Sequence, residues 1–201
     1  KRVILFFLLL ISSFFVQAQN WKDYVHPNST GTVKITESVF NSNASKYIVT
    51  GYFTDSILVE NVDTLSTSGW GIFLAQYDND YNIEWIYEVD GNSYEFRSDL
   101  DIDNNGNIYL TGVFLSSDCY FGSDTTLSST GIGDNFLAKF DNQGKFGWVK
   151  HIGKGGSYQE KNEILVDESD DLLLTLGYND SIKIDDNTID TTLYSDAEGA
   201  H

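Results

Sequence analysis

The chain has 201 residues and a formal net charge of −18, from 30 acidic and 12 basic side chains. Such a surface repels the phosphate backbone of nucleic acids and anionic membranes, so the composition argues against nucleic acid as a partner. Hydrophobic residues make up 41% of the chain and aromatic residues 14%, with 17 glycines and one proline. This composition supplies enough apolar surface for a core and agrees with an extracellular all-β protein.

The first residues have the pattern of a secretory signal peptide. A basic pair, Lys1 and Arg2, precedes an apolar stretch over residues 3–16, and a small residue, Ala18, follows. The uninterrupted apolar run, residues 3–11, is well short of the roughly 18 to 20 residues that a membrane-spanning helix needs. We therefore predict a signal peptide over residues 1–18, no membrane insertion after its cleavage, and a secreted or cell-surface location.

Several landmarks recur along the chain with one period. The tryptophans Trp21, Trp85 and Trp148 are 64 and 63 residues apart. The sequence FLAQYD, which starts at Phe73, returns 63 residues later as FLAKFD, which starts at Phe136. Landmarks that share one period indicate an array of one supersecondary unit, whose copies bury their hydrophobic faces against each other. We place the units at residues 21–84, 85–147 and 148–201, and we interpret the chain as a fragment because the last unit is truncated.

The best-preserved copy predicts four strands in two hairpins. Residues 99–103 alternate polar and apolar side chains, a turn rich in Asn and Gly follows, and residues 108–114 contain β-branched and aromatic residues. Residues 134–141 and 146–152 repeat this arrangement around a second turn. Two hairpins per period predict a four-stranded antiparallel sheet, the composition of one propeller blade, and the loop 115–133 accounts for the long period.

The expected fold of residues 19–201 is therefore all-β, a propeller-like array of about three four-stranded blades that does not complete a ring. A right-handed solenoid of hairpins is the competing arrangement, although solenoid coils usually have shorter periods.

The same copy carries a recognisable repeat motif. In order along the chain it has Asp103, Gly106-Asn107, Tyr-Leu-Thr-Gly at residues 109–112, Leu-Ala-Lys-Phe-Asp at residues 137–141, and Trp148. In these residues the chain resembles the secreted bacterial β-propeller repeat family of the Bacteroidetes type. The resemblance implies a propeller fold, export as part of a type IX-secreted surface protein, and no catalytic set shared across the family.

The tryptophans and the single cysteine are the first residues to consider for binding. Trp21, Trp85 and Trp148 recur at one position of the repeat, which indicates packing between units rather than ligand contact. Trp70 has no tryptophan counterpart in the next copy and lies in a Ser/Gly loop, so it is either an exposed aromatic platform for a ligand or a buried loop anchor. Cys119 has no partner for an internal disulfide, and we expect it to be buried in a strand.

A metal site is suggested by the alternation of Asp101, Asp103 and Asn105, which resembles the first positions of a calcium-binding loop. Calcium takes six to eight oxygen ligands, but the position of the bidentate glutamate is occupied by Gly112. The alternative interpretation is a hairpin turn in which Asn and Gly supply positive φ angles. No cofactor other than this calcium ion is suggested by the sequence.

Motifs for catalysis are scarce. The chain has three histidines, His26, His151 and His201, and no zinc-protease, nucleophile-elbow or phosphate-loop motif. We therefore expect a non-enzymatic, exported propeller module that serves extracellular binding, adhesion or scaffolding, with a glycan or a protein as partner. The alternative is a propeller enzyme acting on extracellular polysaccharide, with acidic residues gathered at the central channel.

Overall fold

The computed structural model describes residues 28–59, 62–129, 133–152, 162–176, 181–185 and 190–194. Within these ranges the chain forms β-strands joined by turns and loops, and no helix. Every named strand pair is antiparallel, so the expected all-β class is confirmed. The predicted signal peptide, residues 1–18, and Trp21 lie outside the described residues.

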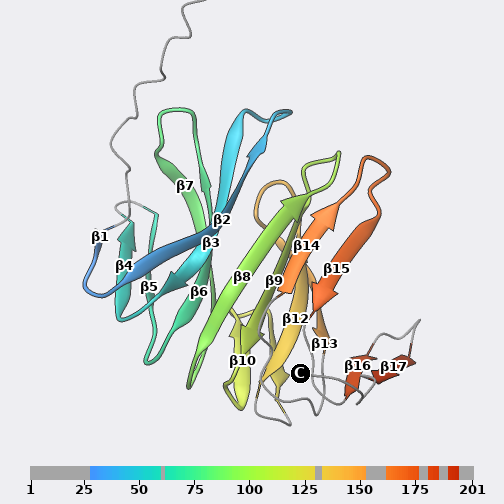
Figure 1. Cartoon of the computed structure of the whole chain (residues 1–201). Coiled ribbons are helices and arrows are strands. Elements are labelled where there is room, and N and C mark those ends of the chain that lie inside the picture. Colours follow the sequence, from blue (N-terminus) through green and yellow to red (C-terminus); the bar gives the residue numbers. More distant parts are fainter. Residues whose placement is uncertain are drawn as a thin grey trace, which may run out of the picture.

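The strands follow one another in the order of Figure 1. They are β1 (Asn28–Ser29), β2 (Val33–Asn41), β3 (Lys46–Phe53), β4 (Ser56–Val59), β5 (Asp63–Ser66), β6 (Gly71–Tyr77), β7 (Ile83–Gly91), β8 (Glu95–Ile102), β9 (Ile108–Phe114), β10 (Asp118–Phe121), β11 (Thr125–Ser128), β12 (Asp134–Phe140), β13 (Phe146–Ile152), β14 (Asn162–Val166), β15 (Leu172–Leu176), β16 (Ser181–Asp185) and β17 (Asp190–Tyr194).

These strands form four sheets, none of which is closed. Sheet 1 has the order β1-β4-β5, and sheet 2 the order β11-β10-β7-β6-β3-β2. Sheet 3 repeats the pattern of sheet 2 with the order β17-β16-β13-β12-β9-β8, and sheet 4 is the hairpin β14-β15. Figure 1 shows the sheets side by side, from β4 and β5 at the left to β14 and β15 at the right.

Each six-stranded sheet combines four strands with a hairpin from later in the chain. The hairpin β10–β11 lies between β9 and β12 in the sequence, yet β10 pairs with β7, where Cys119 opposes Gly91. In the same way β16 pairs with β13, and β4 pairs with β1. The stretch 115–133, expected to be a loop, therefore contains a hairpin that extends the preceding sheet, and this hairpin accounts for the long period.

Two hydrophobic cores lie on opposite faces of sheet 2. Alternate residues of a strand face opposite sides, so Ile48 and Ile72 enter one core while Val49 and Phe73 enter the other. The first core also contains Leu110 and Phe136 of sheet 3, and the second contains residues of β4 and β5. Sheets 1, 2 and 3 therefore pack face to face in the order of the chain.

The aspartate of the repeat motif is a turn residue. In four hairpins its carboxylate accepts hydrogen bonds from the N–H groups two and four positions further on; these are Asp78, Asp103, Asp141 and Asp167. The third residue after each aspartate has a positive φ, at Tyr81, Gly106, Gly144 and Asp170. The repeated Asp and Gly therefore encode hairpin turns.

A β-bulge interrupts β8 near its start. Phe96 pairs with Val113 and Asp99 with Thr111, so two residues of β8 oppose one residue of β9. Val113 and Thr111 lie on the same side of β9, so the bulge places Phe96 and Asp99 on the same side of β8. Arg97, within the bulge, has a φ of 55°.

Candidate functional site

Trp70 packs against three other aromatic side chains, Tyr52, Tyr94 and Phe96. We call these four residues the aromatic cluster. The rings of Tyr52 and Trp70 are stacked, with 5.0 Å between their centroids and 2° between their planes. Tyr94 and Phe96 present edges to the indole at 5.6 Å and 6.2 Å. Trp70 is 36% exposed and Tyr94 is 48% exposed, so the cluster is ordered by ring packing and still reaches the surface.

The backbone holds Trp70 beside the start of β8. Its N–H donates to the carbonyl of Ser93 (3.1 Å), and its carbonyl accepts the N–H of Glu95 (2.8 Å). Trp70 and Tyr94 thereby form an isolated parallel bridge, which places their side chains next to each other. A Cβ on Gly69 would lie 1.8 Å from the carbonyl oxygen of Ser93, so this close approach requires glycine.

Two acidic side chains of β7 fix the loop that carries Trp70. Glu88 accepts the N–H of Ser66 (3.1 Å), and Asp90 accepts the hydroxyl of Thr67 (2.6 Å). Burial, reinforced by the nearby charge of Asp90, raises the pKa of Glu88 to about 7.

A third acid, Glu95, follows Tyr94 in the chain and is fully buried. Its Oε1 accepts the hydroxyl hydrogen of Ser116, while its Oε2 has no hydrogen-bond partner. Burial raises the pKa of Glu95 to about 7, and the charge of Asp90 acts in the same direction.

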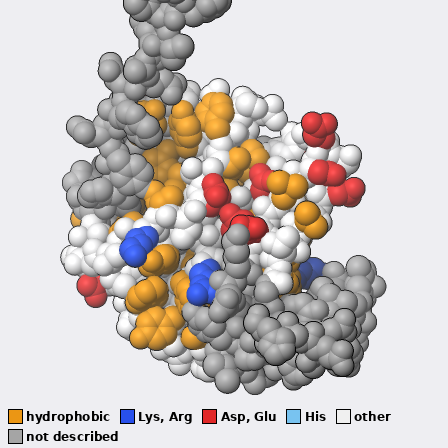
Figure 2. Space-filling view, viewed as in Figure 1, with side chains coloured by type: hydrophobic (Ala, Val, Ile, Leu, Met, Phe, Trp, Pro, Cys, Tyr) orange, Lys and Arg blue, Asp and Glu red, His pale blue; other side chains and the backbone are white. Residues whose placement is uncertain are grey.

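Two cationic side chains flank the aromatic cluster. The Lys34 ammonium lies 5.7 Å from the ring centroid of Tyr52, and the Arg97 guanidinium lies 5.3 Å from that of Phe96. Figure 2 shows basic side chains beside hydrophobic ones in the lower left of this face, with acidic side chains near its middle and at its upper right. The cluster therefore has apolar ring surface bordered by hydrogen-bond donors.

The acidic side chains border a groove of about 460 Å³ that is open to solvent. Glu37 from β2, Asp99 from β8 and Glu163 from β14 line it, together with the apolar residues Val39, Leu100, Ile164, Leu165 and Leu173. Each of the three acids stands four residues before the turn residue of its own repeat, which is Asn41, Asp103 or Asp167. Sequence reasoning missed this set, although the spacing to the turn could have found it.

Asp99 and Asp101 also connect neighbouring sheets. Asp99 accepts the N–H of Ile164 (2.8 Å), and Asp101 accepts the N–H of Val166 (2.7 Å). Burial raises the pKa of Asp99, and the charges of Glu37 and Glu163 add to this effect. Asp99 and Asp101, which both line the groove, are thus used to hold β14, while Glu37 and Glu163 are exposed.

The calcium candidates are Asp101, Asp103 and Asn105. The carboxylate oxygens of both aspartates already accept hydrogen bonds within the protein. Asp101 accepts backbone N–H groups on both carboxylate oxygens. Asp103 is buried and accepts the N–H groups of Asn105 and Asn107 on one oxygen and the Asn107 amide on the other. Within the described ranges, no group of three or more His, Cys, Asp or Glu is placed to hold a metal ion. A calcium ion here would have to displace the hydrogen bonds of the turn.

Trp85 and Trp148 have different surroundings. Trp85 packs against the core between sheets 2 and 3, and a Cβ on Gly144 would lie 2.5 Å from its indole. Trp148 lies 6.4 Å from the ring of Tyr109, within sheet 3. Both are half-buried. Cys119 is fully buried in β10, as expected, and burial raises the pKa of its thiol.

The one histidine within the described ranges, His151, is buried. Its Nε2 lies 3.0 Å from Oδ2 of Asp134, which is fully buried, and its ring packs 5.4 Å from that of Phe114. Because both side chains are buried, we assign this pair to the protein interior next to sheet 3.

Comparison with protein-family models and with curated proteins gives no match for this chain. Within the described residues, no helix has the length and apolar character needed to cross a membrane.

Proposed function

We propose that this chain is an exported, non-enzymatic module of β-propeller repeats that binds an extracellular glycan or protein through the aromatic cluster. The observation that supports this most is the partial exposure of Trp70 and Tyr94 within a packed group of rings. Aromatic rings contribute large binding energy at low conformational cost, because few torsions must be fixed when a ligand arrives.

The propeller arrangement of this proposal rests on the order of the sheets. Strands β2, β8 and β14 are, in chain order, the first strands of sheets 2, 3 and 4, and β8 contacts both β2 and β14. In a propeller the first strand of every blade lines the central channel, and the blades pack face to face. The side-by-side order of the first strands and the face-to-face cores are consistent with both features.

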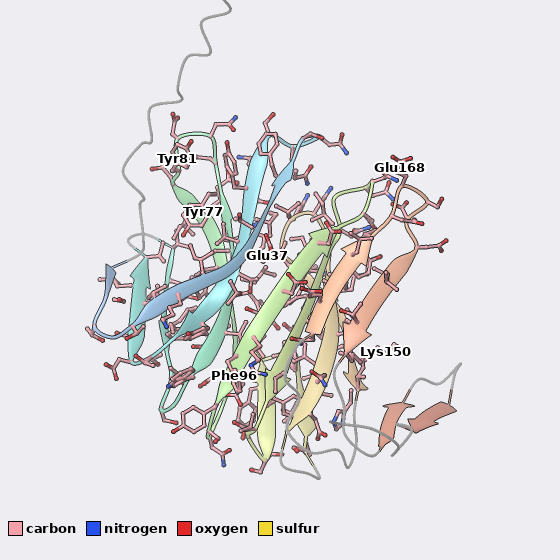
Figure 3. All side chains as sticks on the ribbon, viewed as in Figure 1. Glu37, Tyr77, Tyr81, Phe96, Lys150 and Glu168 are labelled. Atoms are coloured by element: carbon pink, nitrogen blue, oxygen red, sulfur yellow. The ribbon has the colours of Figure 1, made fainter. Side chains whose placement is uncertain are left out.

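The aromatic cluster is tested by binding to a panel of immobilised polysaccharides and extracellular matrix proteins. We expect Trp70→Ala to weaken binding at least tenfold. A matched control is Tyr81→Ala, because Tyr81 is 37% exposed and lies near the top of the molecule in Figure 3, far from Phe96 near the bottom. Equal loss in both variants, or none in either, would contradict the assignment to the aromatic cluster.

A second candidate function is polysaccharide cleavage in the acidic groove. It is favoured by one observation, the placement of Glu37, Asp99 and Glu163 at the same position of successive repeats. Glycosidases use two carboxylates on either side of the scissile bond. Release of reducing ends from a polysaccharide by the protein, abolished in Glu37→Gln, would establish this function in place of simple binding.

A further inference from the structure

The aromatic cluster and the groove lie along the same strand. Phe96 belongs to the cluster and Asp99 to the groove, and the bulge in β8 puts both on one side of that strand. Without the bulge, residues three apart would face opposite sides. Figure 3 shows Phe96 near the lower end of β8 and Glu37 further up, beside the same strand.

The two surfaces differ in what they offer a ligand. The cluster supplies ring surface and the donors of Lys34 and Arg97. The groove supplies an apolar floor with two exposed carboxylates, Glu37 and Glu163, which accept hydrogen bonds. Their combination matches a molecule that has apolar faces, many hydroxyl donors and an extended shape.

The net negative charge of the protein favours uncharged molecules of this kind over anionic ones. With 30 acidic and 12 basic side chains, the protein repels polyanions, and the carboxylates of the groove add a local barrier to a carboxylated or sulfated chain. An uncharged sugar polymer meets no such repulsion, and its hydroxyl groups donate to the carboxylates while its ring faces stack on the aromatic side chains.

We infer that the aromatic cluster and the groove form one continuous site for an uncharged, linear polysaccharide. This inference rests on the proposed binding function and specifies its ligand class. The polysaccharide contacts Trp70 and Tyr94 at one end of the site and Glu37 and Glu163 at the other. Between these ends it follows the side of β8 that carries Phe96 and Asp99.

The site is tested by calorimetry with uncharged oligosaccharides of increasing length, from a β-glucan and a glucomannan series, beside alginate as an anionic chain. Affinity is expected to rise with length until both parts of the site are filled. Trp70→Ala should weaken binding of short and long oligosaccharides, whereas Glu37→Gln should weaken binding of long ones alone, by about tenfold. Alginate should not bind measurably at 0.15 M salt.

The outcomes separate this inference from the proposed function. Binding that depends on Trp70 but not on Glu37 at any length would overturn the continuous site and leave the aromatic cluster as the binding surface. Preference for alginate would overturn the uncharged class. Binding of a protein from the panel, lost in Trp70→Ala, with no oligosaccharide binding, would overturn the glycan ligand while retaining the proposed function. Thermal melting of each variant verifies folding, and Tyr81→Ala serves again as the control.

Discussion

Asp99 of β8 accepts a hydrogen bond of 2.8 Å from the backbone N–H of Ile164 in β14, and thereby joins sheets 3 and 4. Asp101 makes the same kind of bond to Val166 at 2.7 Å. Two carboxylates spaced by one residue thus satisfy two N–H groups of the neighbouring strand. Strands β8 and β14 are therefore joined by hydrogen bonds to side chains and not by a ladder of backbone hydrogen bonds. This leaves the groove open between the two strands.

Asp101→Ala is expected to destabilise the protein by about 1.5–3 kcal/mol, because it leaves the N–H of Val166 without its charged acceptor. The measurement is chemical denaturation at neutral pH. Asp80→Ala is a suitable control, since Asp80 is an exposed acid in a turn and such substitutions usually change stability by less than about 0.5 kcal/mol. Equal stability of the two variants would show that the bond between β8 and β14 contributes little.

The half-buried Glu88 and the fully buried Glu95 predict an unusual pH dependence. Their pKa values are raised to about 7 in the folded protein, above the ordinary value near 4.5, so folding favours their protonated forms. Their contribution to stability is complete below about pH 4.5 and is lost as the pH rises through 7. We expect the melting temperature to fall between pH 5 and pH 8. For Glu95, which is fully buried, the loss is on the order of 3 kcal/mol.

Glu95→Gln isolates this effect. The amide is uncharged at every pH, so the variant should lose less stability than the unmodified protein between pH 5 and pH 8. A melting curve that shifts equally in both proteins would exclude Glu95 as a source of the pH dependence.

Gly144→Ala is expected to destabilise the protein by about 1–3 kcal/mol. Gly144 has a φ of +81°, and a Cβ there would lie 2.5 Å from the Trp85 indole, so the new methyl group meets both backbone strain and overpacking. Gly133→Ala is the control, because the nearest atom to a Cβ there is 3.5 Å away. Similar melting temperatures for the two variants would contradict the contact between Trp85 and this turn.

Calcium at millimolar concentration should leave the melting temperature unchanged, because the oxygens of Asp103 already accept hydrogen bonds from the turn. A rise in melting temperature that disappears in Asp103→Asn would instead establish the calcium site at Asp101, Asp103 and Asn105.

The sequence predicted the strands of the central repeat well. The alternation around residues 99–103 and the two Asn/Gly turns agree with β8, β9, β12 and β13. It predicted a strand at Cys119 but no hairpin in the stretch 115–133, because β10 and β11 have four residues each and β10 pairs with the distant strand β7. Strands this short carry too little periodicity to be recognised without their partner.

The candidate site was predicted in part. The sequence singled out Trp70 because its loop differs from the corresponding loop of the next repeat. Its neighbours Tyr52 and Tyr94 come from distant parts of the chain, and local patterns do not reveal such contacts. In the sequence, three acids of the groove each stand four residues before a turn residue. Only the register shift in β8 shows that Asp99 lies on the same side of the strand as Phe96.

The most direct test of the binding surface is two-dimensional NMR of the indole N–H signals during titration with an uncharged oligosaccharide. Trp70→Phe assigns the signal of Trp70 by its disappearance. The structure predicts that this signal shifts on titration, while that of the half-buried Trp85 does not. A titration that shifts Trp85 or no tryptophan at all, with binding present by calorimetry, would contradict the assignment of the aromatic cluster as the binding surface.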